Sequence, residues 1–380
     1  MSKGRVLMVT HYWPPHVGGI ETVAVEHARR LAERGWEVRV ATSRLRGDPA
    51  RARMGAVDVR RFPCANFPER VFNVPVPLMS PAMLTGLVRE AGDADVVVAH
   101  GHVYLGTQFA AVAANRTGRP FVLVQHAPFI DYGPVLNVVE RAADRTLGRR
   151  VIRAADAVVA VSGFTADFVR TLAPGTEVAI VRSGVDERRF HAGGSTRPPD
   201  RPTVLTVRRL VPRNGVDCLV EAWRRAGLGD RADLVVGGAG PEAEHVEQLA
   251  ASDPSVRLLG YVPDEELADL YRGADVFVLP SRSGEGFGLV ALEAMASGLP
   301  VVATASGGIV DIVTDGVNGR LVPPNDVAAL GAALTELVDD APLRARLAQG
   351  ALQSAEASSW DASIDALEDV LARALADSRI

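Results

Sequence analysis

The sequence predicts an α/β fold with two doubly wound parallel sheets, one in each of two domains. The chain has 380 residues, which is more than a single core of ordinary size accommodates. Short β-branched runs alternate with longer amphipathic stretches, a pattern typical of βα units. At 191–202 a stretch rich in Gly, Pro and polar residues interrupts this alternation, which then restarts. These observations predict two sheets of similar size joined by a linker.

The first half of the chain is expected to open with a strand, a helix and a second strand. The helix is expected at 20–35, because Val23, His27 and Leu31 fall on one stripe and Gly35 marks its end. The strands expected in this half are 6–9, 38–41, 57–61, 96–99, 121–124 and 157–161.

The second half repeats this pattern after the linker. A helix is expected at 289–296, where good helix formers run up to Gly298 and Pro300. Ligands bind outside the carboxyl ends of strands in such sheets, so functional residues are expected in the loops that follow strands. The strands expected in this half are 203–207, 234–236, 256–259, 276–279, 301–303 and 320–322.

Composition and charge exclude several classes of protein. Hydrophobic residues make up 47% and charged residues 23%, as in globular proteins, and the net charge of −5 gives no overall nucleic-acid footprint. Cys64 and Cys218 lie far apart and form no metal-ligand pattern. A disulfide between them is not expected, which favours a reducing compartment. No run is long and apolar enough to span a bilayer, and the N-terminus lacks a signal-peptide pattern. We therefore expect a cytoplasmic protein, peripheral at the inner face of the membrane at most.

The segment 281–300 carries the strongest functional signal. Glu285 and Glu293 are separated by seven residues, and glycines surround the first of them. Glu285 is expected in a glycine loop before the helix at 289–296, and Glu293 about two turns inside that helix. Glycines allow a ligand to approach the backbone, and the free N–H groups at a helix start form an anion site. The plain alternative is a tight turn with a capping glutamate, which this glycine spacing with two glutamates disfavours.

With this motif, the chain resembles the retaining GT-B glycosyltransferases of the family 4 type, also called glycosyl transferases group 1. The match is EGFGLVALE at 285–293, and it is specific. The resemblance implies two Rossmann-like domains facing a central cleft: an acceptor-side domain at 1–191 and a donor-side domain at 192–357, with a helix at about 358–380 packing back on the first. Further matching segments are PPHVGG at 14–19, QHAP at 125–128, TVRRLVPRNG at 206–215, GGAGPE at 237–242, GVNG at 316–319 and Trp360.

The resemblance also implies roles for the residues of these segments. Glu285 would lie beside the transferred sugar, and Glu293 would bind the hydroxyl groups of the nucleotide ribose. Gly18 and Gly19 precede a helix, and their amides would contact the donor phosphate; the plain alternative is a turn without a ligand. The other substrate-binding residues implied are Gly238, Tyr261, Gly286, Phe287, Gly288, Leu289 and Val290.

Arginines follow the expected strand at 203–207. Arg209 matches the arginine that holds the diphosphate in the family, whereas Asn214 stands where the family usually has lysine. We expect Arg213 to replace the missing charge of that lysine. Without the resemblance, these arginines would be assigned to a solvated loop.

His126 follows a strand at the histidine position of the family. The resemblance makes it a catalytic residue that hydrogen-bonds the sugar, although a lone histidine is more often structural. His100 and His102 raise the alternative of a zinc site with His126. No cysteine or carboxylate cluster accompanies them in the sequence, which disfavours zinc.

The sequence thus predicts a retaining glycosyltransferase that moves a hexosyl or related sugar from a UDP- or GDP-linked donor to a small-molecule, glycan or lipid-linked acceptor. No Asp-x-Asp motif stands in a suitable loop, so neither a metal nor another cofactor is expected, and cations would stabilise the leaving group. A phosphorylase would need a pyridoxal lysine, and Lys3 is the only lysine. The remaining alternative is a non-catalytic subunit that binds nucleotide sugar beside a partner enzyme; Asn214 is the feature that favours it.

A cluster of arginines lies on an expected helix of the first half. It is either a solvated helix face or a patch for anionic lipid or a phosphorylated acceptor. Its members are Arg141, Arg145, Arg149, Arg150 and Arg153.

Overall fold

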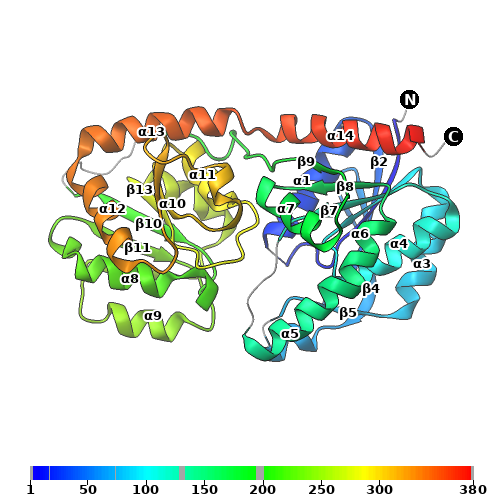
Figure 1. The fold of residues 1–380 in the computed structure, drawn as a ribbon, viewed down its shortest axis with the longest axis horizontal. Helices are drawn as coiled ribbons and strands as arrows, with labels where there is room; N and C mark the ends of the chain where they lie inside the picture. The colour runs from blue at the N-terminus through cyan, green and yellow to red at the C-terminus, as the bar shows by residue number, and fades with distance from the viewer. Residues whose placement is uncertain (1–2, 17, 73, 128–132, 194–200, 378–380) are drawn as a thin grey trace. The chain divides into compact units, whose positions relative to one another are not determined.

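The computed structural model describes residues 3–16, 18–72, 74–127, 133–193 and 201–377. The chain divides into two compact units (Figure 1). Unit 1 is Met1–Arg182 together with Asp361–Ile380, and unit 2 is Ser183–Trp360. The predicted boundary lay later, at 191. Residues just after 182 contact unit 2, since Val185 pairs with Ser359 and Phe190 packs edge-on against Tyr271.

Unit 1 contains a sheet with the order β3-β4-β2-β1-β6-β7-β8-β9. Its strands pair in parallel, except that β3 and β5 both pair with β4 in antiparallel fashion. The strands are β1 (Gly4–Val9), β2 (Trp36–Arg44), β3 (Arg51–Met54), β4 (Val57–Ala65), β5 (Leu78–Met79), β6 (Val96–His100), β7 (Phe121–Gln125), β8 (Ala157–Ala160) and β9 (Val178–Ile180).

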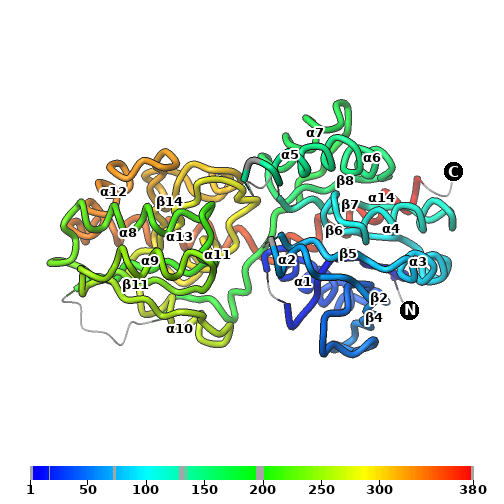
Figure 2. The backbone as a smooth tube through the Cα atoms, turned by 90° about the horizontal axis from the view of Figure 1, so that it is seen from below, coloured from blue at the N-terminus to red at the C-terminus, as the bar shows by residue number. Residues whose placement is uncertain are grey.

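The helices of unit 1 cover both faces of this sheet, as expected for a doubly wound fold. Alternation along β1 separates the two cores: Val6 and Met8 pack toward α1 and α14, whereas Leu7 and Val9 pack toward α3, α4, α6 and α7. Helices α3 and α4 lie side by side (Figures 1 and 2). The helices are α1 (Gly19–Glu33), α2 (Phe67–Phe72), α3 (Pro81–Asp93), α4 (Leu105–Thr117), α5 (Pro134–Ala143), the π-helical η1 (Asp144–Gly148), α6 (Arg149–Ala154) and α7 (Gly163–Leu172).

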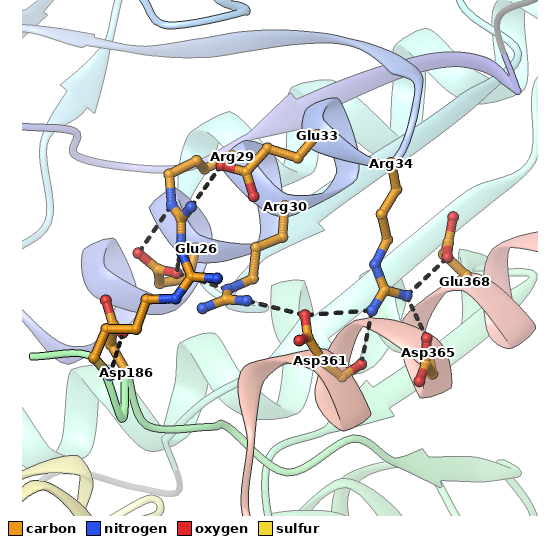
Figure 3. A network of polar contacts seen from close by, with 10 residues as sticks. Glu26, Arg29, Arg30, Glu33, Arg34, Asp186, Asp361, Asp365 and Glu368 are labelled. Carbon is orange, nitrogen blue, oxygen red and sulfur yellow. Dashed lines mark hydrogen bonds and ion pairs between the residues drawn. The ribbon is translucent and has the colours of Figure 1, made fainter. Parts of the chain in front are cut away.

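The last helix, α14 (Trp360–Asp377), packs on unit 1. Its apolar face enters the core on the α1 side of the sheet through Ile364, Leu367 and Leu371. A polar network joins its exposed edge to α1 (Figure 3). Within that network, Arg34 lies 3.0 Å from Glu368, whose carboxylate also accepts a hydrogen bond of 2.6 Å from the indole of Trp36.

Unit 2 contains a parallel sheet with the order β12-β11-β10-β13-β14-β15. Its strands are β10 (Thr203–Val207), β11 (Asp233–Gly237), β12 (Val256–Gly260), β13 (Val276–Leu279), β14 (Val301–Thr304) and β15 (Gly319–Val322). Its helices are α8 (Val216–Arg225), α9 (Ala243–Ala250), α10 (Leu267–Arg272), α11 (Leu289–Ala296), α12 (Val327–Asp339) and α13 (Ala341–Glu356), with short turns η2 (Pro212–Asn214), η3 (Leu228–Asp230), η4 (Asp264–Glu266) and η5 (Gly307–Asp311).

The expected fold class is confirmed, and each expected strand is present within a few residues of its predicted bounds. Three observed strands were not expected: β3, β5 and β9. They are two to four residues long, and β3 (Arg-Ala-Arg-Met) carries no β-branched residue. Pairing with β4, rather than local propensity, therefore places β3 and β5 in the sheet.

Candidate active site

The glycine loop and helix of the glutamate motif are present in unit 2. Gly288 is the N-cap of α11, and Glu285 lies in the loop before it. Glu293 is about one turn inside the helix, not two as expected, because the helix begins at Leu289 and a turn takes 3.6 residues. Of the predicted amide donors, Gly286, Leu289 and Val290 are partly exposed, whereas Phe287 is buried.

The backbone at Glu285 is held by the turn that follows β14. The carbonyl oxygen of Glu285 accepts a hydrogen bond of 2.9 Å from the amide of Gly308. Gly307 adopts φ +66°, and a Cβ atom there would collide with the same carbonyl oxygen. The loop therefore needs glycine at 307, and this contact fixes the position from which the Glu285 side chain extends.

Arg208, for which the sequence predicted no role, contacts Glu285. Its Nη2 lies 3.2 Å from Oε2 of Glu285 and donates to Oδ1 of Asn214 at 3.0 Å. Its Nη1 donates to Oγ of Ser281 at 2.7 Å. The Arg208 side chain is only 7% exposed. Burial lowers its pKa, an effect that the nearby carboxylate of Glu285 opposes.

Asn214 supports this arrangement from the other side. Its Nδ2 donates to the carbonyl oxygen of Arg209 at 2.6 Å, while its Oδ1 receives Arg208. The Arg209 side chain itself is exposed, and Arg213 is partly exposed. The phosphate-binding roles of Arg209 and Arg213 stay predictions. Arg208 belongs to the run of arginines expected after the strand at 203–207, but the sequence analysis gave a role only to Arg209 and Arg213.

Glu293 contacts Tyr271, a fully buried residue of α10. The Tyr271 hydroxyl lies 3.1 Å from Oε2 of Glu293 and 3.3 Å from the carbonyl oxygen of Val290. Desolvation raises the pKa of Glu293 to about 7, and the hydrogen bond from Tyr271 opposes that rise. The Glu293 carboxyl group therefore titrates near neutral pH.

The glycine turn after β11 packs against the backbone of Arg208. Gly238 has φ +138°, and a Cβ atom there would collide with the Arg208 carbonyl oxygen. The amide of Gly238 donates to the carbonyl of Gly260 at 2.7 Å, and Tyr261 next to it is 71% exposed. The turn thus connects the ends of β10, β11 and β12. Substrate contacts of Gly238 and Tyr261 stay predictions.

In unit 1, a carboxylate lies at the N-terminus of α1. Gly18 is the N-cap and Gly19 the first helical residue, while Val17 of the same motif falls outside the described residues. Glu21 is buried with Oε2 close to Gly18, and its Oε1 lies 3.2 Å from Nε2 of His11. Burial raises the pKa of Glu21. A protein carboxylate therefore lies where we expected the donor phosphate, and phosphate binding by Gly18 and Gly19 stays a prediction.

His126 is buried directly after β7. Its Nε2 lies 2.8 Å from Nδ1 of His100, so one ring donates to the other. Burial lowers the pKa of His126 to about 3 and that of His100 well below its ordinary value, so both rings are neutral at physiological pH. Contact of His126 with the sugar stays a prediction, and Pro128 of its motif falls outside the described residues.

His102 belongs to a second polar group at the same sheet edge. Its Nε2 lies 2.8 Å from Oδ1 of Asp144, and its Nδ1 lies 3.0 Å from Oε1 of Gln125. His102 is thus held by a carboxylate and an amide instead of joining His126. In the described part of the chain, no group of three or more His, Cys, Asp or Glu side chains could hold a metal ion.

The predicted arginine cluster is spread over α5, η1 and α6, and its five side chains are all exposed. Among the described residues, no helix has the length and apolar character needed to cross a membrane.

Two family models match the chain, one in each half. The model described as Glycosyltransferase Family 4 matches residues 17–189, and the model described as Glycosyl transferases group 1 matches residues 187–354.

Curated relatives match over most of the chain. The D-inositol 3-phosphate glycosyltransferase of Acidothermus cellulolyticus is 34% identical, and the match covers 99% of this chain and 91% of the relative. The enzyme of the same name from Geodermatophilus obscurus is 36% identical, with 92% and 83% covered.

Solved structures share the fold at low sequence identity. The sucrose-phosphate synthase of Thermosynechococcus elongatus has a TM-score of 0.81 at 20% identity, covering 99% of this chain and 100% of that chain. Anabaena HepE, solved in complex with UDP, has a TM-score of 0.76 at 19% identity, covering 97% and 100%.

Proposed function

The chain belongs to family 4 of the glycosyltransferases, and from that premise we propose that it is a retaining, metal-independent enzyme that transfers a hexosyl or related sugar from a nucleotide-sugar donor to an acceptor hydroxyl. Its activity as a glycosyltransferase and its GT-B fold follow from the family. The stereochemical course, the metal independence, the donor and the division of roles between the two units are the proposal.

The observation that best supports donor binding by unit 2 is the group around Glu285. A buried guanidinium, a carboxylate and the N-terminus of a helix meet there, contributed by Arg208, Glu285 and α11. Arginine and a helix N-terminus both favour a diphosphate. A carboxylate in the same group suits a sugar whose anomeric carbon becomes positive in the transition state.

The proposed reaction exchanges one bond on one face of the sugar. The bond from the anomeric carbon to the phosphate oxygen breaks, and its electron pair stays on the departing nucleoside diphosphate. The acceptor oxygen bonds to the same face of that carbon, and its proton passes to the departing phosphate oxygen.

The residues of the chain would stabilise the charges that develop in this step. Arg208, Arg209 and the amides at 286–290 would neutralise the negative charge on the diphosphate. Glu285 would stabilise the positive charge on the sugar ring. Glu293 would hold the ribose. It would thus position the donor but take no part in the bond exchange.

Incubation of the purified protein with UDP- and GDP-linked hexoses and an acceptor tests the proposal. NMR of the product should show the anomeric configuration of the donor, and an inverted product would contradict it. A thermal-shift panel of UDP, GDP, ADP and TDP identifies the base, because a ligand of the native state raises its apparent stability. UDP is our first choice, since HepE was solved with UDP. The acceptors to compare are D-inositol 3-phosphate, for which the relatives are named, and neutral alcohols.

Asn214 was the feature that favoured a non-catalytic subunit, because it removes the charge of the usual lysine. Arg208 supplies a positive charge at the same place, with its Nη2 3.0 Å from Oδ1 of Asn214. This contact supports an enzyme over a non-catalytic subunit.

For location, we propose a cytoplasmic enzyme with peripheral contact at the inner membrane face. The exposed arginines of η1 and α6 support this, because basic helix faces attract anionic lipids. Sedimentation with vesicles of anionic lipid should decrease when Arg149 and Arg150 are both replaced by Ala. Equal sedimentation with neutral vesicles would contradict an electrostatic contact.

A further inference from the structure

An apolar cavity of about 280 Å³ lies at the carboxyl edge of the unit 1 sheet. Its walls come from the start of α1, the segment between α2 and β5, the loop after β6, and α5. Segments far apart in the sequence thus form one cavity, large enough for a ring system or a short alkyl chain. Its apolar wall includes Ile20, Val74, Val76, Val103, Leu136 and Val139.

Polar side chains reach the cavity where the strands end. His102 and Gln125 both line it. They are hydrogen-bonded to each other, and His102 is also held by Asp144. The Gln125 amide also donates to the carbonyl oxygen of Ala127 at 2.5 Å. The cavity therefore has a rigid polar end and apolar walls, which suits a ligand with a hydroxyl group at one end and an apolar body.

The charge of the cavity disfavours an anionic ligand. Among the described residues that line it, none is lysine or arginine, and Glu140 contributes a carboxyl group. A phosphate monoester carries a charge of about −1.5 to −2 at neutral pH and is bound where arginine or lysine meets it. Burial of such a charge without a cation is costly.

We propose that this cavity binds the apolar body of the acceptor, which is a neutral phenol or alcohol rather than a phosphorylated polyol. This inference rests on the proposed function, because only a transferase needs an acceptor. The acceptor of this chain would then differ in chemical class from that of enzymes that glycosylate an inositol phosphate, although the fold is shared.

The helix α5 offers a matched pair of variants for the test. Val138 and Val139 are adjacent and similarly exposed, at 66% and 61%, but only Val139 lines the cavity. Val139→Arg places a cation in the cavity wall, and Val138→Arg adds the same charge beside it. The probe is 4-methylumbelliferone, a neutral fluorescent phenol at a pH below that at which it ionises, and binding is measured by fluorescence polarisation without donor.

We expect Val139→Arg to weaken probe binding by about tenfold or more, because a charge replaces apolar wall, and Val138→Arg to leave it unchanged. With a donor present, glycosylation of the probe should decrease in the same order. D-inositol 3-phosphate should fail to displace the probe from the unsubstituted protein. Equal probe binding by the two variants would overturn the proposal. So would displacement of the probe by D-inositol 3-phosphate at a lower concentration than by a non-fluorescent phenol.

The donor is measured separately in the same samples. UDP should raise the melting temperature of both variants equally, because the nucleotide is assigned to unit 2. If no nucleotide shifts the melting temperature and no donor is consumed, the transferase proposal fails, whatever the probe shows. If donor is consumed but the probe does not distinguish the variants, only the cavity assignment fails.

Discussion

Arg208 and Glu285 form a partly buried ion pair in unit 2, with Nη2 of the arginine 3.2 Å from Oε2 of the glutamate. The same nitrogen donates at 3.0 Å to Asn214, the residue that stands where the sequence resemblance implies lysine. A lysine at 214 and the arginine at 208 would thus deliver their charges to the same place. In this chain the positive charge is therefore carried by residue 208, at the end of β10. The side-chain amide of residue 214 supports it.

Replacement of Arg208 by Ala should lower kcat/KM. The fall should correspond to a loss of about 2–4 kcal/mol of transition-state stabilisation, the usual cost of losing a charge-assisted contact in a site without water. Arg213→Ala, at the position that we first expected to supply this charge, should cost less than Arg208→Ala, because the Arg213 side chain is partly exposed. Steady-state kinetics with a good acceptor measures both. A larger loss from Arg213→Ala would return the role to Arg213.

The control for this experiment separates lost charge from lost structure. Asn214→Lys in the Arg208→Ala background should recover part of kcat, because it restores a cation beside Glu285. Asn214→Ala alone should cost less than Arg208→Ala, since it removes the support but leaves the charge. A double variant no more active than Arg208→Ala, with its melting temperature restored, would count against a charge role.

Chelation should leave activity unchanged if arginines and helix amides neutralise the leaving diphosphate. The expected result is an equal initial rate with and without EDTA, after dialysis against the chelator. A control with Mg²⁺ added back separates a true requirement from a general salt effect. Complete loss of activity on chelation, restored by Mg²⁺, would contradict the proposal that arginines and helix amides act in place of a metal ion.

Much of the fold was predictable because each long strand carries its own β-branched run. The helix at 289–296 matched residue for residue, since Gly288 and Gly298 bracket a run of helix formers. The short strands β3 and β5 were not predictable in the same way. They exist because β4 offers unpaired backbone groups, which is a tertiary effect.

The site was predictable as a set of segments but not as a set of contacts. Two adjacent arginines follow β10, and the sequence does not reveal which of them turns inward. The amides of Arg208 and Leu210 donate to the carbonyls of Gly237 and Ala239, so the backbone pairing continues past β10. Arg209 lies between these two residues, and its side chain is exposed. Likewise, Glu21 was passed over because a first-turn glutamate is ordinary on a helix, and only the fold places it against His11.

Leu371→Ala in α14 should destabilise unit 1 by about 2–5 kcal/mol, the usual cost of truncating a fully buried leucine. Arg373→Ala, two residues away on the exposed side of the same helix, is the matched control and should change stability by less than about 0.5 kcal/mol. Urea unfolding followed by circular dichroism measures both variants. Equal stability of the two would mean that the helix contributes little to the core of unit 1.

The final prediction concerns Glu293, whose pKa desolvation raises to about 7. If its carboxylate accepts hydrogen bonds from the ribose hydroxyls, only the ionised form binds well, so donor affinity should rise with pH. With a pKa near 7, the ionised fraction is about tenfold smaller at pH 6 than at pH 8, and the apparent Kd changes by the same factor. UDP-glucose is the better probe than UDP, because its diphosphate does not titrate in this range.

Variants of Glu293 and Tyr271 test whether Glu293 causes the pH dependence of donor binding. Glu293→Gln should bind UDP-glucose more weakly and with no dependence on pH over this range, and it should raise KM more than it lowers kcat. Tyr271→Phe removes a hydrogen bond that lowers the pKa, so its midpoint should move to higher pH. The ligand-free protein should show the opposite trend: because the folded pKa exceeds the unfolded value of 4.5, stability is fully present below that value and is lost as pH rises through about 7. A pH dependence of binding that persists in Glu293→Gln would assign the titration to another group and remove Glu293 from the ribose.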